Sequence, residues 1–386
     1  MVTMAFPIFR PPLVREDDGR FVPLAAELGA RFAPGAAAHD RENTFVADNY
    51  VALRESGYTL LPIPEELGGL GASARQVCAA QAELARHCAA TALAIAMHLH
   101  PVASTAYRWR RGGKGAEAVL RRIAEQRLIV CSSGASDFTH PSGVAEPREG
   151  GFAVSGRKVF CSQAPAGDLL ASAAVLDGGA EVLAFLAPMR DPAVRVLDTW
   201  DTLGMRATAS QDVVLDGLQV PDELVIGRRP LGKLDPTLRA AYIHALPIIG
   251  AVYLGIAAAA RDEAVRLAVG RGRTGDRLVQ RQVGDMDVRL RAGWWALLGA
   301  LEEFGGGDPT PGAMNAIFAA KHLVTLGAME VVDKAMELAG GASYYRSSLL
   351  ERAYRDVRAG KYHPLTPDLA LVYAGRVGLD LPGDEV

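Results

Sequence analysis

Cysteine is scarce in this sequence of 386 residues, and no two cysteines form a CxxC pair. The four that occur, Cys78, Cys88, Cys131 and Cys161, are scattered among apolar or small residues. Cysteines in such surroundings behave as buried apolar groups. We therefore expect reduced thiols in the core rather than a disulfide framework.

Positive charge is not in surplus either. The sequence has 41 Lys and Arg against 44 Asp and Glu, a formal net charge of −3. Its last stretch, from Pro364 to Val386, has one arginine against three aspartates and one glutamate, so there is no basic tail. A chain of this charge has no electrostatic reason to bind a polyanion. We expect no nucleic-acid partner.

Long hydrophobic runs are also missing. The longest mainly apolar run, Ala89 to Met97, is shorter than the roughly 20 residues that cross a bilayer. The N-terminal sequence MVTMAFPIFRPPLVRED is broken by three prolines and does not start with a charge, so it does not resemble a signal peptide. We expect a cytoplasmic protein with no membrane partner.

The sequence does contain enough apolar material for a large core. Hydrophobic residues make up 49% and charged residues 22%, as in soluble globular proteins. The length exceeds what one continuous core usually holds and predicts two or three packed units. The expected fold is α+β and mainly α, with helices over residues 1–127, strands over 128–229 and helices again over 230–386.

Periodicity supports this division. Apolar residues recur at helical spacing from Ser73 to Tyr107, after a proline and glycine break from Leu61 to Gly71. Short runs of Val, Ile and Phe predict strands at Gly151 to Phe160 and Asp212 to Val220, in a region whose size suits a sandwich or barrel. Glycine breaks then delimit about four helices, typical of a bundle, and lie at Gly270–Gly275, Gly305–Gly307 and Gly340–Gly341.

Three local motifs follow one another along this layout. The first is GYTLLPIPEELGGLG from Gly57 to Gly71. The second is WDTLGMRATASQDVV from Trp200 to Val214, followed by VPDE from Val220 to Glu223. The third is AGGASYY from Ala339 to Tyr345, followed by LERAYRD from Leu350 to Asp356. In order and spacing the motifs resemble the acyl-CoA dehydrogenase superfamily over nearly the whole chain.

That resemblance implies an N-terminal helical domain, a middle β-sandwich or barrel domain and a C-terminal four-helix bundle. It also implies a flavin, usually FAD, wedged between the β domain and the bundle. The substrate is expected to be a small molecule. Subunits of this superfamily associate through the bundle, so we expect a homo-oligomer, a tetramer or a dimer.

Two segments are expected from the resemblance to touch the flavin ring, Val130 to Asp137 and Lys158 to Ser162. Phe160 takes the place of a tryptophan that flanks the flavin, and Ser162 that of a threonine whose hydroxyl meets flavin N5. Ser132 offers a second hydroxyl. A hydroxyl both donates and accepts, so it can follow N5 as its protonation changes. The alternative is that both serines are strand-end hydroxyls bonded to backbone.

The resemblance also points to contacts for the cofactor phosphates. The segment from Arg271 to Gln280 looks like a shortened form of the superfamily's phosphate loop, and either Arg271 or Arg273 could supply a forked donor. A solvated basic turn is the alternative. Gly340 and Gly341 either let the backbone approach the cofactor or end a helix. Because the loop is shortened, FMN is the alternative to FAD.

The superfamily's catalytic carboxylate is missing. Dehydrogenation of an acyl thioester needs a base that removes the α-proton. Alignment on Arg355 and Asp356 puts the usual glutamate at Pro364, and the minority position falls at about Ile243. Neither residue can accept a proton, so ordinary dehydrogenation lacks its base.

Histidines stand near these positions instead. His363 precedes Pro364, His244 follows Ile243, and His98 and His100 lie on the N-terminal helical run. Imidazole titrates near neutral pH and can both donate and accept a proton. The alternative for each histidine is a structural role. His98 and His100 have no carboxylate or cysteine at suitable spacing, so no metal site is expected.

Serine at the N5 position together with a histidine after the Arg-Asp pair resembles the flavin-dependent monooxygenases of this superfamily. We therefore expect oxygenase-type chemistry, in which reduced flavin captures O2, with His363, Ser162 and His98 as catalytic candidates. A flavin reductase or an electron-transfer protein is the expected partner. The alternatives are FAD-dependent acyl-CoA dehydrogenation with a non-standard base and a catalytically degenerate flavin-binding protein.

Overall fold

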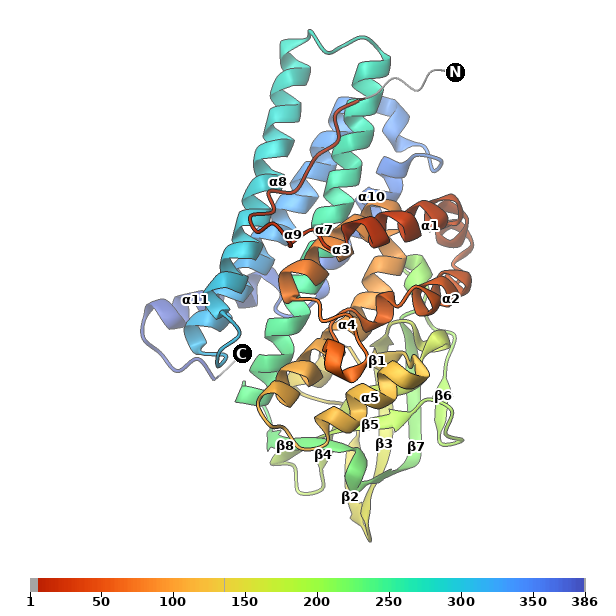
Figure 1. Ribbon diagram of the computed structural model, residues 1–386, viewed down its shortest axis with the longest axis vertical. Coiled ribbons are helices and arrows are strands. Elements are labelled where there is room, and N and C mark those ends of the chain that lie inside the picture. The colour runs from red at the N-terminus through yellow and green to blue at the C-terminus, as the bar shows by residue number, and fades with distance from the viewer. Residues whose placement is uncertain (1–5, 135, 385–386) are drawn as a thin grey trace.

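The computed structural model describes residues 6–134 and 136–384. Figure 1 shows a helical N-terminal region, a sheet at one end of the molecule and long C-terminal helices that extend away from the sheet. The mainly helical α+β fold is thereby confirmed. Two expectations fall partly outside the described residues: residues 1–5 belong to the N-terminal sequence without signal-peptide features, and Ala135 belongs to a segment expected to touch flavin.

The N-terminal region is built from helices joined by short 3-10 turns. They are α1 (Val22–Glu42), α2 (Ala47–Glu55), η1 (Tyr58–Leu60), η2 (Glu65–Leu67), α3 (Ala74–His87), α4 (Ala89–Arg110) and α5 (Ala116–Gln126). A capping box begins α3, where the Ser73 hydroxyl accepts from the Gln76 amide and the Gln76 side chain accepts from the Ser73 amide. The helical run expected to reach Tyr107 is interrupted, because Cys88 is extended at φ −145° and separates α3 from α4. No glycine or proline marks this break in the sequence.

The middle region forms one mixed sheet of eight strands within the described residues. Its elements are β1 (Val130–Ser132), α6 (Ser136–Thr139), β2 (Val144–Arg148), β3 (Gly151–Cys161), β4 (Leu169–Leu176), β5 (Glu181–Pro188), β6 (Val194–Val196), β7 (Gln211–Pro221) and β8 (Val225–Pro230). The strand order is β6-β7-β3-β2-β4-β5-β8, and β1 pairs parallel to β4.

Strands β3 and β7 form a long antiparallel ladder in which Phe152 opposes Val220. The register shifts between Lys158 and Cys161, and within this irregular stretch Phe160 has a φ of 55°. Such irregularities re-aim a side chain relative to the regular pleat. The aromatic side chain of Phe160 is accordingly 57% exposed.

Long helices dominate the C-terminal region. They are α7 (Pro236–Gly270), α8 (Arg277–Phe304), α9 (Pro311–Ala339), α10 (Leu349–Val357) and α11 (Pro367–Gly378), with 3-10 turns η6 (Gly340–Tyr344) and η7 (Arg358–Tyr362). The three glycine breaks are confirmed, since α7, α8 and α9 each end at one of them. The fourth helix of the expected bundle is instead split into α10 and α11. Pro364 lies in the connection, and proline cannot continue a helix because it lacks the N–H.

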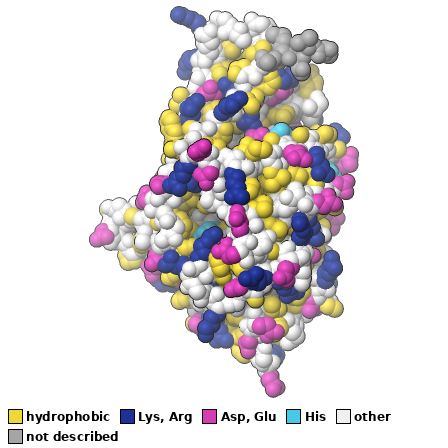
Figure 2. Space-filling model, viewed as in Figure 1, with side chains coloured by type: hydrophobic (Ala, Val, Ile, Leu, Met, Phe, Trp, Pro, Cys, Tyr) yellow, Lys and Arg dark blue, Asp and Glu magenta, His cyan; other side chains and the backbone are white. Residues whose placement is uncertain are grey.

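Helix α7 is long and apolar enough to cross a membrane. The expectation that Ala89 to Met97 is the longest mainly apolar run is therefore wrong, because the run from Ala245 to Ala260 within α7 is longer. However, 89% of the most apolar stretch of 18 residues in α7 is buried inside the chain. Its apolar side chains therefore serve the core of the bundle, where α7 lies against α3, α4 and α9. On the face seen in Figure 2, basic and acidic side chains are interspersed among hydrophobic ones.

Charged contacts join the three regions where the second and third motifs meet. The Arg355 guanidinium on α10 contacts both carboxylate oxygens of Asp40 on α1, at 2.9 and 2.6 Å, and donates to the Leu203 carbonyl. The next residue, Asp356, accepts from the Met205 amide at 2.6 Å. Burial raises the pKa of Asp356 to about 6. The motifs thus meet in space as a joint between the regions.

Candidate functional site

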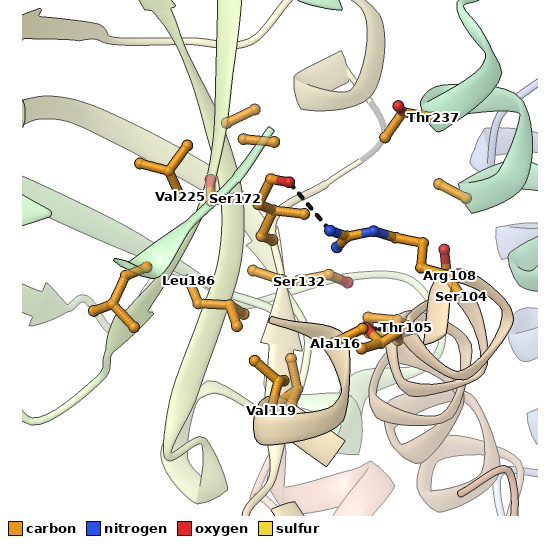
Figure 3. A pocket seen from close by; sticks show the side chains of 18 of the residues that line it. Ser104, Thr105, Arg108, Ala116, Val119, Ser132, Ser172, Leu186, Val225 and Thr237 are labelled. Atoms are coloured by element: carbon orange, nitrogen blue, oxygen red, sulfur yellow. Dashed lines mark hydrogen bonds between the residues drawn. The ribbon is translucent and has the colours of Figure 1, made fainter. Parts of the chain in front are cut away.

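A cavity of about 180 Å³ lies where α4, α5, the sheet and the start of α7 meet. Its wall is mainly apolar on the sheet and α5 sides, with Val119, Leu186 and Val225 pointing inward (Figure 3). Polar groups come from α4, β1 and β4, and charged side chains from neighbouring segments, including Asp137 of α6 and Arg229 of β8, complete the lining. A mainly apolar cavity with a few convergent polar groups is the usual form of a small-molecule site.

The histidine that lines this cavity is His100, which the sequence did not single out above the others. Its Nε2 lies 3.5 Å from the Ser132 Oγ, and Ser132 also lines the cavity. Burial, together with the proximity of His244, His98 and His363, lowers the pKa of His100 to about 3. The ring is therefore neutral at physiological pH, with one nitrogen that donates a hydrogen bond and one that accepts.

His98, by contrast, has no ring nitrogen left for a ligand. Its Nε2 donates to the Thr59 carbonyl at 2.8 Å, and its Nδ1 accepts from the Val130 amide at 3.0 Å. The side chain is fully buried, and burial lowers its pKa to about 4. In this geometry His98 ties α4 to η1 and β1. The catalytic role expected for His98 stays a prediction, and both ring nitrogens of the folded protein are engaged by backbone groups.

His363 lies outside the residues that line the cavity, between the C-terminal helices. Its Nε2 lies 2.7 Å from the Tyr253 hydroxyl on α7. Lys321 on α9 donates to the His363 carbonyl at 2.9 Å and to the Leu365 carbonyl at 2.7 Å. Burial and the nearby Lys321 lower the pKa of His363 to about 3. His244, the remaining candidate, is bonded through Nδ1 to the Ala240 carbonyl at 2.7 Å.

The two segments expected to touch the flavin ring are linked to each other. The Gly134 amide donates to the Val159 carbonyl at 2.8 Å, and a Cβ on Gly134 would lie only 2.8 Å from that oxygen. Below this contact, buried Lys158 pairs with buried Asp137 at 3.2 Å. The structure thus brings the two segments into contact near the end of β3.

Directly after β3, Ser162 begins a chain of hydroxyl groups. Its Oγ lies 2.8 Å from the Ser210 Oγ, which lies 2.7 Å from the Thr208 Oγ1. Beside it the exposed ring of Phe160 meets Trp200 edge to face, with ring centroids 5.9 Å apart. An exposed aromatic ring beside a hydroxyl that donates or accepts fits a flat, polar ring system such as a flavin.

The residues proposed for phosphate binding lie elsewhere, at the end of the C-terminal helices away from the sheet (Figure 1). Arg271 donates to the Ala339 carbonyl at 2.9 Å, next to Gly340. Arg273 instead pairs with Asp276 at 2.9 Å and is exposed. A Cβ on Gly340 or Gly341 would meet no described atom within 4 Å. Within one chain, this group is separated from Ser132, Phe160 and Ser162.

Within the described residues, no unpaired carboxylate is buried in the cavity wall. Of its two acidic lining residues, Asp137 pairs with Lys158 and also accepts from Ser142, while Glu223 is exposed at the rim. Ile243, one position expected for the missing base, is buried in the core, and Pro364 occupies the other. No group of three or more His, Cys, Asp or Glu side chains that could hold a metal occurs among the described residues. The four cysteines are free and buried, as expected.

Several residues of the site carried no sequence signal. Arg108 of α4 reaches across the cavity, Ser172 of β4 bonds to Ser133 at 2.9 Å, and Lys321 holds the loop of His363. Isolated arginines, serines and lysines are common on any helix or strand. Only the pairing of distant segments distinguishes these from the others.

Comparison with known proteins gives two matches to domain models. The model described as acyl-CoA dehydrogenase, N-terminal domain, matches residues 24–113, and that of the C-terminal domain matches residues 247–367. Putative acyl-CoA dehydrogenase YdbM of Bacillus subtilis is 31% identical over 368 residues, covering 89% of this chain and 92% of its own. L-evernosamine nitrososynthase of a Micromonospora species is 35% identical over 367 residues, covering 88% of this chain and 85% of its own.

Among solved structures, KijD3 in complex with FMN and dTDP-3-amino-2,3,6-trideoxy-4-keto-3-methyl-D-glucose is similar over 97% of both chains. Its TM-score is 0.89 and its sequence identity 31%.

Proposed function

The chain belongs to the acyl-CoA dehydrogenase superfamily and is a flavin-dependent oxidoreductase of that fold, and we propose that it catalyses an oxygenase reaction with FMN. The substrate is a small organic molecule bound in the cavity between α4, α5 and the sheet. When bound, the reduced flavin supplies the electrons that activate O2. The protein supplies the cavity, its polar groups, and side chains that exchange a proton with the substrate.

The observation that carries the proposal is the chemistry of the cavity wall. An acyl-CoA dehydrogenase needs a carboxylate near the substrate, and here Asp137 is already paired while Glu223 is exposed at the rim. The neutral ring of His100, next to the hydroxyl of Ser132, takes that place. Such a pair can move a proton to or from an oxidised substrate without a carboxylate.

We assign the acid/base role to His100 and keep His363 as the second candidate. His100 lines the cavity, whereas the Nε2 of His363 is engaged by Tyr253. His363 remains close enough to His100 to help lower its pKa. Ser162 and Phe160 would hold the flavin ring at the end of β3, where their side chains are adjacent to the hydroxyl of Ser210 and the ring of Trp200.

FMN is favoured over FAD by two observations. KijD3, similar over nearly the whole chain, was solved with FMN. In addition, Arg271, one of the two arginines expected to bind phosphate, follows α7 at the end of that helix away from the sheet (Figure 1), whereas Ser162 directly follows strand β3. FMN is short enough to bind next to Ser162 without also reaching Arg271.

Two similar proteins suggest what the substrate resembles. One is L-evernosamine nitrososynthase, and KijD3 was solved with dTDP-3-amino-2,3,6-trideoxy-4-keto-3-methyl-D-glucose, an amino sugar linked to dTDP. Aminated sugar derivatives therefore head the substrate panel. We further propose a cytoplasmic homo-oligomer supplied with reduced flavin by a separate reductase or electron-transfer protein.

The test begins with protein that has been reduced anaerobically in the presence of FMN and is then mixed rapidly with O2. We expect reoxidation through a transient flavin absorbance whose lifetime shortens in His100→Ala and is unchanged in His39→Ala, a histidine on α1. The same protein should oxidise members of the amino-sugar panel.

The rival is dehydrogenation of an acyl thioester, the reaction suggested by the name of YdbM. Anaerobic bleaching of the bound flavin by acyl-CoAs of several chain lengths, with transfer of the electrons to an artificial acceptor, would overturn the oxygenase proposal. Failure of the purified protein to retain either FMN or FAD would favour a degenerate flavoprotein.

A further inference from the structure

Arg108 occupies an unusual position for an arginine, because it extends from α4 into a mainly apolar cavity (Figure 3). Its Nη2 donates to the Ile226 carbonyl at 3.3 Å. In the described part of the chain the guanidinium makes no other hydrogen bond and no ion pair. A guanidinium has five N–H donors, so most of them remain available toward the cavity.

The surrounding charges do not supply a counterion. Three cationic side chains line the cavity, Arg108, Lys114 and Arg229, against the carboxylates of Asp137 and Glu223. Asp137 is neutralised by Lys158, which leaves Glu223, exposed at the rim and not within ion-pair distance of Arg108. Burial lowers the pKa of Arg229, and the carboxylate of Asp235 opposes this effect. The excess of positive charge at the cavity therefore lies on Arg108 and Lys114, while the chain as a whole is slightly negative.

The guanidinium of Arg108 is partly buried, so its positive charge is unfavourable unless an anion binds next to it. Loss of water alone lowers the pKa of Arg108, with no carboxylate to oppose the effect. Charges removed from water are normally paired. An arginine kept in an apolar cavity without a partner is poised for one that arrives with a ligand, and its planar fork matches the oxygens of a phosphate or carboxylate.

We propose that Arg108 is the anchor for an oxyanion carried by the substrate, so that the natural substrate has a phosphate or carboxylate as well as the group that is oxidised. Arg108 and His100 lie two helical turns apart on α4, since eight residues span about 12 Å at roughly 1.5 Å per residue. The anchor would therefore hold one end of an elongated molecule and present the other to His100 and Ser132. Lys114, exposed at the rim, adds attraction for the incoming anion.

This inference rests on the proposed function only in taking the cavity as the substrate site, and its test measures binding without turnover. The probes are inorganic pyrophosphate and succinate, titrated by calorimetry into the flavin-loaded protein at low ionic strength. The comparison is between wild type, Arg108→Gln, Arg108→Lys and Arg110→Gln. Arg110 is the matched control, an exposed arginine on the same helix with no ion pair in the described structure.

We expect the wild-type protein and Arg110→Gln to bind at least one probe with similar affinity. Arg108→Gln should weaken that binding at least about tenfold, and Arg108→Lys should restore part of it. Tighter binding of pyrophosphate identifies a phosphorylated substrate, and tighter binding of succinate a carboxylated one. Absence of binding by wild type, or equal binding by Arg108→Gln, would overturn the anchor.

A failed anchor can be distinguished from a failed oxygenase. If pyrophosphate binding depends on Arg108 but reduced protein shows no oxygen chemistry, the anchor stands and the reaction is different. If oxidation of a neutral amine is as fast in Arg108→Gln as in wild type, while probe binding is absent from both, the oxygenase stands without the anchor. Circular dichroism spectra and flavin content confirm that the variants are folded.

Discussion

The Nε2 of His100 and the Oγ of Ser132 lie 3.5 Å apart at the wall of the cavity, on two segments separated by 32 residues. The contact joins α4 of the helical region to β1 of the sheet region. It is longer than a normal hydrogen bond to nitrogen, and catalytic contacts often tighten only when substrate is bound.

This pair gives the first prediction. His100→Ala should lower the rate of substrate oxidation by about 10²–10⁴-fold, the usual contribution of a positioned acid or base. Ser132→Ala should lower it by roughly twofold to tenfold, the effect of one neutral hydrogen bond. Single-turnover oxidation measures both, and the double variant should lose less than the product of the two losses, because the residues act together. If the rate of the double variant falls by the full product of the two single losses, His100 and Ser132 act independently of each other.

A second prediction concerns His98 and acid. Burial lowers its folded-state pKa to about 4 from an ordinary value of 6.5, so the unfolded chain takes up the proton first as the pH falls. The stabilisation by the neutral ring is complete above about pH 6.5 and is lost as the pH falls toward 4. The loss between pH 8 and pH 5 is about 2 kcal/mol for such a group.

Urea unfolding at pH 8 and pH 5 checks this. We expect the wild-type protein to lose stability at pH 5, and His98→Gln to lose about 2 kcal/mol less between the two pH values. At pH 8 the variant should already be about 1–3 kcal/mol less stable, because glutamine cannot serve both the Thr59 carbonyl and the Val130 amide with the geometry of the ring. An unchanged pH dependence in the variant would show that His98 does not carry this effect.

Lys321 yields a third prediction. Its ammonium group bonds to two carbonyls of the connection between α10 and α11, those of His363 and Leu365. Lys321→Met leaves both oxygens without a donor, and each unsatisfied buried group costs about 1–3 kcal/mol. Removal of the buried charge offsets part of this loss.

The control for Lys321 is Lys334→Met, on the same helix but paired with Glu337 near the surface. We expect the free energy of unfolding, measured with urea, to fall clearly in Lys321→Met. In the control it should change by less than about 0.5 kcal/mol. Equal midpoints in the two variants would mean that the connection holds itself in place without Lys321.

Phe160 provides a fourth prediction, on the flavin. Its ring is exposed and contacts Trp200 edge to face. Phe160→Ala should therefore leave global stability nearly unchanged but weaken FMN binding by roughly twofold to tenfold, the value of one aromatic contact. Fluorescence titration of FMN measures the affinity, with Val144→Ala, a partly exposed position on β2, as control. Unaltered affinity in Phe160→Ala would remove the ring from the flavin site.

Much of the fold could be predicted from the sequence because its signals are local. Gly270, Gly305 and Gly340 mark helix ends since glycine ends helices without strain. Two local departures were not predictable. Nothing in the composition around Cys88 reports its extended backbone, and the division of the last helical segment depends on how its connection packs beneath Lys321.

The site divides in the same way. By itself the sequence determined that both positions of the usual base are occupied by residues that cannot accept a proton, and that histidines stand nearby. It put forward His98 rather than His100 as a catalytic candidate, although both lie on the same helical run. Two residues along a helix are about 200° apart around its axis, so the two rings point in nearly opposite directions, and only the packing of α4 against the sheet decided which one faces the cavity. The same packing left Arg108 of α4 without a carboxylate, because a counterion is a property of neighbours in space rather than in sequence.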